Sequence, residues 1–251
     1  MGGYIVLAFA AAQFVAWFGW SNLGIIVAVI GAGVIASFGL GPSLLLTALD
    51  FGAPPHGGFA FGLEDWQMTA PLREAGYVVL APMLRGENGQ AGNFTLFYDE
   101  VDDVLAAGRF LAAQPFVDAT RVYVAGHSGG GTLALLAAMS AKDFRAAASF
   151  SGSPDQVLYC RLGLPAEQVP FDVADPREFE LRSPLSYAQS FRCPARLYFG
   201  SQEPHFRLST ERTAELAHAA GLDVQAVAVE GDHFSALPAS MEQALIFFEE
   251  H

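Results

Sequence analysis

Apolar and charged positions divide the chain into two parts. Residues 1–49 contain no Asp, Glu, Lys or Arg, and the first charged residue is Asp50. Residues 4–20 are apolar apart from Gln13, and residues 23–40 form a second apolar run. Each run is close to the minimum length of a membrane-spanning helix, about 17 residues. We therefore expect an apolar, helical N-terminal segment over residues 1–49 that associates the chain with a membrane through residues 4–40.

Other interpretations of this segment stay open. It could form a pair of buried helices within a globular fold, or one long tilted span instead of two. A secretory signal is disfavoured because the basic region that begins such signals is missing. The first Lys or Arg is Arg73, so the positive-inside rule gives no orientation across a membrane.

After residue 71 the pattern alternates between short apolar runs and amphipathic runs. The apolar runs, typical of buried strands, are 77–82, 121–126, 146–152, 195–200 and 224–231. The runs with helical periodicity are 96–114, 131–141, 209–221 and 240–250. Strands that alternate with helices predict an α/β fold with a mostly parallel sheet and helices on both faces. In such sheets, ligands bind at the carboxyl ends of the strands.

One long stretch breaks this alternation. Residues 153–194 have an irregular pattern and contain six of the chain's 14 prolines. They leave room for a short helical flap such as residues 175–189. We therefore divide the chain into the N-terminal segment, residues 1–49, and one α/β domain, residues 50–251.

Charge and cysteine content narrow the possible partners. The net charge is −13, and the basic residues, 12 Arg and Lys142, are scattered, which disfavours a nucleic-acid partner. Cys160 and Cys193 are too few for a disulfide framework and lack metal-ligand spacing, so one disulfide and two free thiols both stay open. We expect no metal and no cofactor. The acidic cluster of Asp99, Asp102 and Asp103 is typical of a solvated helix face.

Three polar residues each follow a predicted strand, in the chain order serine, acid, histidine. Ser128 follows the second apolar run, Glu203 the fourth and His233 the fifth. A serine hydroxyl needs a base to become a nucleophile, a histidine with a pKa near ~6.5 supplies one, and a carboxylate orients that histidine. Asp232 is a rival acid, but it is disfavoured because adjacent side chains rarely converge. The amide of Gly129, at the start of the following helix, would face the developing oxyanion.

The motif "GHSGG", residues 126–130, matches the G-x-S-x-G turn of the α/β-hydrolase fold. Together with "GYVVLAPMLRGENG", "RSPLSYAQSFRCPARLYFGSQEP" and "EGDHF", it resembles the catalytic domain of prolyl oligopeptidase-like serine hydrolases and their dienelactone-hydrolase-like relatives. The resemblance covers about residues 56–250. It implies an α/β-hydrolase fold with Ser128 as nucleophile, His233 as base and Glu203 as acid, where the family usually has Asp.

The resemblance extends to the rest of the site. "HGGF", residues 56–59, matches the family's oxyanion segment, which implies that backbone amides of Gly58 and Phe59 act with Gly129. The side chains expected to line the substrate pocket are His127, His205, Phe206 and Phe61. The two strands that normally open this fold have no counterpart unless the apolar N-terminal segment supplies them.

These residues predict a serine hydrolase that cleaves a carboxylic ester, or secondarily a short peptide, through an acyl-enzyme. The first alternative is a prolyl oligopeptidase-like serine peptidase. The second belongs to another class: a membrane-tethered binding protein that keeps the fold and has lost catalysis. An intact serine, acid and histidine favour an enzyme.

Overall fold

The computed structural model of the chain describes residues 34–37, 45–49, 69–80, 82, 84–86, 91–163 and 169–251. Within these residues, one sheet has seven strands in the order β1-β3-β2-β4-β5-β6-β7. The strands are β1 Val34–Ser37, β2 Leu45–Leu49, β3 Val78–Leu80, β4 Val122–His127, β5 Ala146–Phe150, β6 Ala195–Gly200 and β7 Val224–Val229. Strand β1 runs antiparallel to β2 and β3, and the other pairings are parallel. The predicted mostly parallel sheet is confirmed.

Strands β1 and β2 come from the apolar segment before residue 50. Strand β2 lies between β3 and β4, with Leu45 opposite Val122 in the parallel register. The expectation of a helical segment is therefore wrong for these two strands, which supply the opening of the fold. An apolar run without polar alternation suits a buried strand as well as a helix, so its pattern does not distinguish the two.

The remainder of that segment, residues 1–33 and 38–44, lies outside the described residues, as do residues 50–68. The first predicted membrane span and most of the second fall there. No helix in the described part of the chain is long and apolar enough to cross a membrane.

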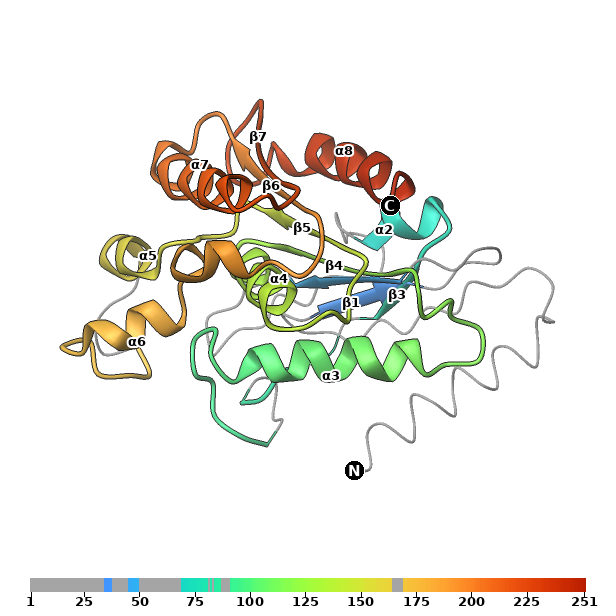
Figure 1. Cartoon of the computed structure of the whole chain (residues 1–251), viewed down its shortest axis with the longest axis horizontal. Coiled ribbons are helices and arrows are strands. Elements are labelled where there is room, and N and C mark those ends of the chain that lie inside the picture. Colours follow the sequence, from blue (N-terminus) through green and yellow to red (C-terminus); the bar gives the residue numbers. More distant parts are fainter. Residues whose placement is uncertain are drawn as a thin grey trace.

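Helices cover both faces of the sheet, as the alternation predicted. They are α2 Thr69–Glu74, α3 Glu100–Ala112, α4 Gly129–Ser140, α5 Gln156–Gly163, α6 Pro176–Leu181, α7 Pro204–Ala219 and α8 Leu237–Glu249, with a 3₁₀ helix η2 at Pro184–Ser190. Buried residues of α3, α4 and α7 share one core cluster, and those of α2 and α8 share the other. Figure 1 shows α3 and α8 on opposite sides of the sheet.

Strand β4 shows how the sheet holds these two layers. Val122 and Val124 point into the cluster with α3 and α4, while Tyr123 and Ala125 point into the cluster with α8. All are at most 1% exposed, because alternate side chains of a central strand face opposite covered sides. Helix α4, which follows this strand, is buried throughout Gly129–Met139, so its N-terminus is fixed in the interior.

The stretch between β5 and β6 is more helical than expected. The predicted flap over residues 175–189 is confirmed by α6 and η2, whereas α5 lies where an irregular segment was expected. Helix α6 begins where Asp175 accepts a hydrogen bond from the amide of Arg177, with Pro176 at the first helical position. Both features stabilise a helix start.

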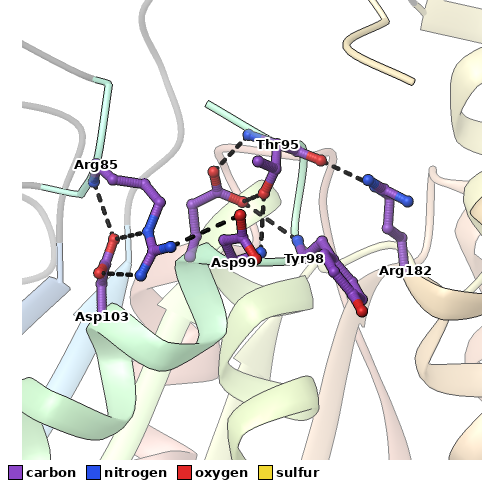
Figure 2. Close-up of polar contacts among 7 residues, drawn as sticks. Arg85, Thr95, Tyr98, Asp99, Asp103 and Arg182 are labelled. Atoms are coloured by element: carbon purple, nitrogen blue, oxygen red, sulfur yellow. Dashed lines mark hydrogen bonds and ion pairs between the residues drawn. The ribbon is translucent and has the colours of Figure 1, made fainter. Parts of the chain in front are cut away.

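Arg182 links the stretch between β5 and β6 to the loop before α3 by a hydrogen bond (Figure 2). Its side chain is buried, donates from Nε to the carbonyl oxygen of Thr95 at 2.9 Å, and pairs through Nη1 with Glu178 Oε2 at 2.6 Å. The guanidinium also lies 4.2 Å from the ring centroid of Phe171. These contacts hold this stretch against the loop before α3.

The acidic start of α3 is less solvated than its sequence indicated. Asp103 accepts bonds from Arg85 Nε at 3.0 Å and Nη2 at 2.8 Å, and Asp99 Oδ2 lies 3.6 Å from Arg85 Nη1 (Figure 2). The interpretation as a solvated face is therefore wrong for Asp103, whose side chain is 24% exposed, and holds for the exposed side chains of Asp102 and Asp99. The ion pairs tie Arg85, which follows β3, to the N-terminus of the helix.

Candidate active site

Ser128 lies on a strained turn between β4 and α4. Its backbone has φ 57° and ψ −125°, a conformation that residues with a side chain rarely adopt. The amide of Ser128 donates to the carbonyl oxygen of Phe150 at 2.8 Å, and its carbonyl accepts from the amide of Thr132 at 3.2 Å. These bonds anchor the turn on both sides. A strained strand-to-helix turn of this kind exposes the serine hydroxyl at the carboxyl edge of the sheet.

Gly126 makes this turn possible. A Cβ atom at Gly126 would lie 2.2 Å from the carbonyl oxygen of Gly130, far inside van der Waals contact. The strand and the first turn of α4 can approach this closely only because residue 126 has no side chain. The first glycine of the G-x-S-x-G motif is therefore required sterically in this structure.

Glu203 and His233 are in direct contact. Glu203 Oε1 lies 2.6 Å from His233 Nδ1, which donates the hydrogen because a carboxylate accepts. The other oxygen, Oε2, accepts from the amide of Gly200 at 2.8 Å and from the hydroxyl of Ser151 at 2.6 Å. Both carboxylate oxygens are thus occupied, and the carboxylate is aimed at the imidazole.

These contacts keep the Glu203 carboxyl ionised. The side chain is only 3% exposed, and burial by itself would raise the pKa. The hydrogen bonds from His233, Ser151 and Gly200 outweigh burial and lower the pKa of Glu203 below its usual value. A buried carboxylate held in this way stabilises positive charge on the imidazole that it contacts.

Asp232, the rival acid, has a separate role. Its Oδ1 accepts from the amides of Phe234 at 3.1 Å and Ser235 at 2.8 Å, and from the Ser235 hydroxyl at 2.7 Å. The Ser235 and Phe234 bonds lower the pKa of Asp232 to about 2. Asp232 therefore shapes the turn that carries His233.

His127 holds that turn from the strand side. Its side chain is 2% exposed, and Nε2 donates to the backbone carbonyl oxygen of His233 at 2.7 Å. The two imidazole rings have centroids 4.6 Å apart. His127, the residue before Ser128, thus links the end of β4 to the backbone of His233. Among the described residues, no hydrogen bond joins the Ser128 hydroxyl to His233 directly, and such bonds often tighten only when substrate binds.

Two phenylalanines pack against the imidazole of His233. The Phe206 ring stacks on it with centroids 5.7 Å apart, and the Phe234 ring meets it edge-on at 5.1 Å. His205 contacts Phe206 at 4.5 Å. Two of the predicted pocket residues, His127 and Phe206, therefore contact His233, and a third, His205, contacts Phe206. The fourth, Phe61, lies outside the described residues.

Of the three predicted oxyanion donors, the structure describes one. Gly129 is the first residue of α4, directly after Ser128, where helix amides lack intrahelical acceptors. Gly58 and Phe59 lie outside the described residues. The described part of this arrangement is an amide next to Ser128 at the positive end of a helix dipole.

The sequence missed two groups that contact Glu203. Ser151 follows β5 directly, and the amide of Gly200 belongs to the last residue of β6. Both stand at the carboxyl edge of the sheet, so the rule that located Ser128 could have located Ser151. The sequence interpretation extended the β5 strand to residue 152 and so placed Ser151 inside it.

Metal and thiol chemistry are separate from this site. Among the residues that the structure describes, no group of three or more His, Cys, Asp or Glu side chains could hold a metal ion. Cys160 and Cys193 are free thiols, which settles the alternative between a disulfide and free cysteines. Burial raises the pKa of Cys193 to about 12, so this thiol is protonated and inert at neutral pH.

Two family models match separate parts of the chain. The model of the prolyl oligopeptidase family matches residues 64–228, more than half of the 251 residues. A model of the AbgT transporter family matches residues 1–53. The first match includes Ser128 and Glu203, and the second covers the uncharged segment.

The relatives differ in how much of their length this chain matches. The uncharacterized peptidase YtmA of Bacillus subtilis (strain 168) is 27% identical over 154 residues, 57% of this chain and 60% of that protein. Dipeptidyl peptidase 4 of Porphyromonas gingivalis superposes with a TM-score of 0.67 at 18% identity, over 86% of this chain and 31% of its own.

A Klebsiella pneumoniae structure assigned as a dienelactone hydrolase has a TM-score of 0.50 at 16% identity, over 72% of this chain and 78% of its own. These two structural likenesses show the α/β-hydrolase fold that the sequence resemblance implied. The chain spans less than two thirds of YtmA and about a third of the dipeptidyl peptidase.

Proposed function

The chain belongs to the prolyl oligopeptidase family, and on that premise we propose that it is a serine hydrolase acting through Ser128, His233 and Glu203. The single observation that carries the proposal is the Glu203–His233 contact of 2.6 Å at the same edge of the sheet as Ser128, whose φ is 57°. An ionised acid, an imidazole and a strained serine turn are the parts that acyl transfer requires.

In the proposed reaction, Ser128 Oγ attacks the substrate carbonyl carbon while Nε2 of His233 takes the hydroxyl proton. Glu203 stabilises the imidazolium and keeps its orientation. The oxyanion of the tetrahedral intermediate accepts from the Gly129 amide, with the backbone near Gly58 as second donor. The imidazolium then protonates the leaving group, and the acyl-enzyme is hydrolysed by a water that His233 deprotonates in turn.

Short peptides are the substrate class that we propose first. Membership of the prolyl oligopeptidase family and the likeness to the peptidase YtmA support amide cleavage. The ester preference expected from the sequence stays a second prediction, since an alkoxide or phenoxide leaves more readily than an amine that must first be protonated. The proposed pocket residues Phe206 and His205 would contact either acyl group.

Labelling with a fluorophosphonate probe tests the nucleophile. The wild-type chain should form a covalent adduct, whereas Ser128→Ala should not, and turnover of that variant should fall on the order of 10⁴-fold or more. Ser140→Ala, at the last position of α4, is a control that should label like wild type. A folded wild-type chain that does not react would favour the non-enzymatic binding protein.

Comparing two chromogenic substrates tests the substrate class. Each kcat/KM is divided by the rate constant of the uncatalysed hydrolysis of the same substrate, because the ester is intrinsically more reactive. We expect the normalised value for an aminoacyl or prolyl p-nitroanilide to exceed that for p-nitrophenyl butyrate. An ester advantage that persists after this correction, by tenfold or more, would replace the peptidase proposal with the esterase one.

We also propose that the uncharged N-terminal segment associates with a membrane. Residues 1–49 carry no charged side chain, and the AbgT family match covers them. The second predicted span is shortened, because β1 belongs to the sheet, so the first run, residues 4–20, is the proposed anchor. The full chain should sediment with membranes after a high-salt wash. Introducing Ala12→Lys with Val15→Asp should release it, because charges at a helix centre oppose insertion.

A further inference from the structure

We propose that Ser151 is a positioning residue for the reaction: its hydroxyl holds the Glu203 carboxylate in the orientation that His233 requires. The proposal rests on the proposed function of Ser128, Glu203 and His233. Ser151 touches neither the serine nor the histidine in the described contacts, so it acts through the acid.

The contact itself is short and buried. Ser151 Oγ donates to Glu203 Oε2 at 2.6 Å, and the two residues are 5% and 3% exposed. Hydrogen bonds to ionised groups are stronger than neutral ones, and exclusion of water strengthens them further. The opposite oxygen of the same carboxylate faces His233 Nδ1 at 2.6 Å. Any rotation of the carboxylate that broke the Ser151 bond would therefore also displace the oxygen that orients the imidazole.

The backbone of Ser151 indicates that a side chain is required at this position. Its φ is 48°, in the left-handed region that favours glycine, and the next residue in the chain is Gly152. The amide of Ser151 donates to the carbonyl oxygen of Tyr198 at 2.8 Å, which fixes this conformation against β6. A glycine would adopt this backbone more easily, but it could not supply a hydroxyl to the acid.

Glu203 needs a second restraint because of its length. Its backbone begins α7, and its amide donates to the carbonyl of Gly200, so the side chain must fold back toward the end of β6. A glutamate has one more rotatable bond than an aspartate, and that freedom must be removed to fix the carboxylate plane. The amide of Gly200 restrains Oε2 from one side, and Ser151 restrains it from β5.

The hydrogen bond from Ser151 to Glu203 also affects the pH at which the Glu203–His233 pair loses a proton. The Ser151 hydroxyl stabilises the ionised carboxylate, and its bond is one cause of the lowered pKa of Glu203. Without that donor the carboxylate would be less stabilised by the protein, and the pair would retain its shared proton to higher pH. Removing the hydroxyl should therefore move the acidic limb of the kcat/KM profile upward.

Among the residues that the structure describes, few other titratable groups lie near the Glu203–His233 pair. His127 approaches His233 from β4, with ring centroids 4.6 Å apart, and Asp232 precedes His233 on the exposed turn. His205 reaches the imidazole only through Phe206. None of these contacts changes when the Ser151 hydroxyl is removed, so a shifted pH profile would report on the acid–histidine pair.

The test uses two substitutions at one position and a control. Ser151→Ala removes the hydroxyl, and Ser151→Gly removes it while relieving the positive φ, so the glycine variant keeps the fold even where the alanine variant is strained. Ser240→Ala is the matched control. Ser240 is 2% exposed, and in the described part of the chain its hydroxyl bonds the carbonyl oxygen of Ala236, the residue before α8, and does not contact Glu203.

We expect both Ser151 variants to lower kcat by about 10- to 100-fold, the range for losing a hydrogen bond to a charged group. KM should stay within about twofold, the acidic limb of the kcat/KM profile should move upward by up to about one pH unit, and the control should match wild type. A folded Ser151→Gly variant with wild-type kcat and pH profile would overturn the positioning role alone. Wild-type protein that neither turns over substrate nor labels at Ser128 would overturn the proposed function, and this proposal with it.

Discussion

Glu203 and Glu100 are both buried carboxylates near the start of a helix, 3% and 0% exposed. Glu100 begins α3 and accepts hydrogen bonds from the Thr95 amide at 2.6 Å, the Thr95 hydroxyl at 2.9 Å and the Tyr98 amide at 3.2 Å. Glu203 accepts from an amide and a hydroxyl as well. The difference is that one oxygen of Glu203 faces the imidazole of His233.

That difference separates a carboxylate that organises local backbone from one that contacts a titratable imidazole, as the proposed reaction requires. Every described donor to Glu100 is neutral and belongs to the loop immediately before its own helix, so this carboxylate organises local backbone. The contacts of Glu203 come from the residue after β5, the last residue of β6 and the loop after β7, three neighbouring places at the carboxyl edge of the sheet. Burial and full hydrogen bonding are common to both. The titratable partner and its position at the strand ends distinguish Glu203.

Replacing each carboxylate by an amide tests this contrast, and the largest effect is expected at Glu203. Glu203→Gln should reduce kcat by about 10³- to 10⁴-fold, because a neutral amide no longer stabilises the imidazolium and can orient it in the wrong tautomer. Steady-state kinetics on a chromogenic substrate measure this loss, and circular dichroism checks that the variant is folded. Residual activity above a tenth of wild type would remove Glu203 from the reaction.

Glu100→Gln should have the opposite profile. The amide NH₂ group would meet the N–H and O–H donors of Thr95 or Tyr98, so the free energy of unfolding should fall by about 1–3 kcal/mol. Because the contacts of Glu100 lie within its own loop, kcat of the folded variant should stay within about twofold of wild type. Denaturant unfolding and kinetics on the same preparation make the comparison. A tenfold loss of kcat at unchanged stability would contradict the structural assignment.

The pH dependence of stability provides a third comparison. The folded protein lowers the pKa of Glu203, whereas an unfolded glutamate titrates near ~4.3. Between these values the unfolded chain binds more protons, so the contribution of Glu203 is complete above about pH 4.3 and is lost as pH falls through the folded value. The stability difference between wild type and Glu203→Gln should therefore shrink on acidification below about pH 4.3. A difference that is constant from pH 6 to pH 3 would show that Glu203 carries no such linkage.

The sequence predicted the positions of the three candidate residues at the strand ends more directly than the contacts around them. Ser128, Glu203 and His233 each follow an apolar run, and a parallel sheet brings the ends of such runs to one edge. The restraint from Ser151 depends on a hydroxyl that reaches across neighbouring strands, which no periodicity encodes. The pairing of Arg85 with Asp103 is likewise a tertiary contact between residues 18 positions apart.

The edge of the sheet was harder to predict for a different physical reason. Strands β1 and β2 lie in an uncharged stretch whose length and hydrophobicity also suit membrane helices. Strand β2 is a central parallel strand, and such strands are covered on both faces and lack the polar alternation that identifies a half-exposed strand. The choice between strand and helix therefore depended on pairing partners such as Val122 and Val78, which lie far along the chain.

The smallest effect is expected at Asp232, the acid next to His233. Its Oδ1 accepts from Phe234 and Ser235 alone among the described residues, so Asp232→Asn should leave kcat within about twofold of wild type, because the amide oxygen still accepts these turn bonds. The folded pKa of about 2 lies below the unfolded value near ~3.9. The carboxylate therefore stabilises the fold above about pH 3.9 and loses this contribution as pH falls toward 2. Unfolding curves of wild type should converge on those of the variant across this window, while kinetics at neutral pH stay the same. If Asp232→Asn lowers kcat more than Glu203→Gln does, the two acids have exchanged roles and the contrast between Glu203 and Glu100 loses its basis.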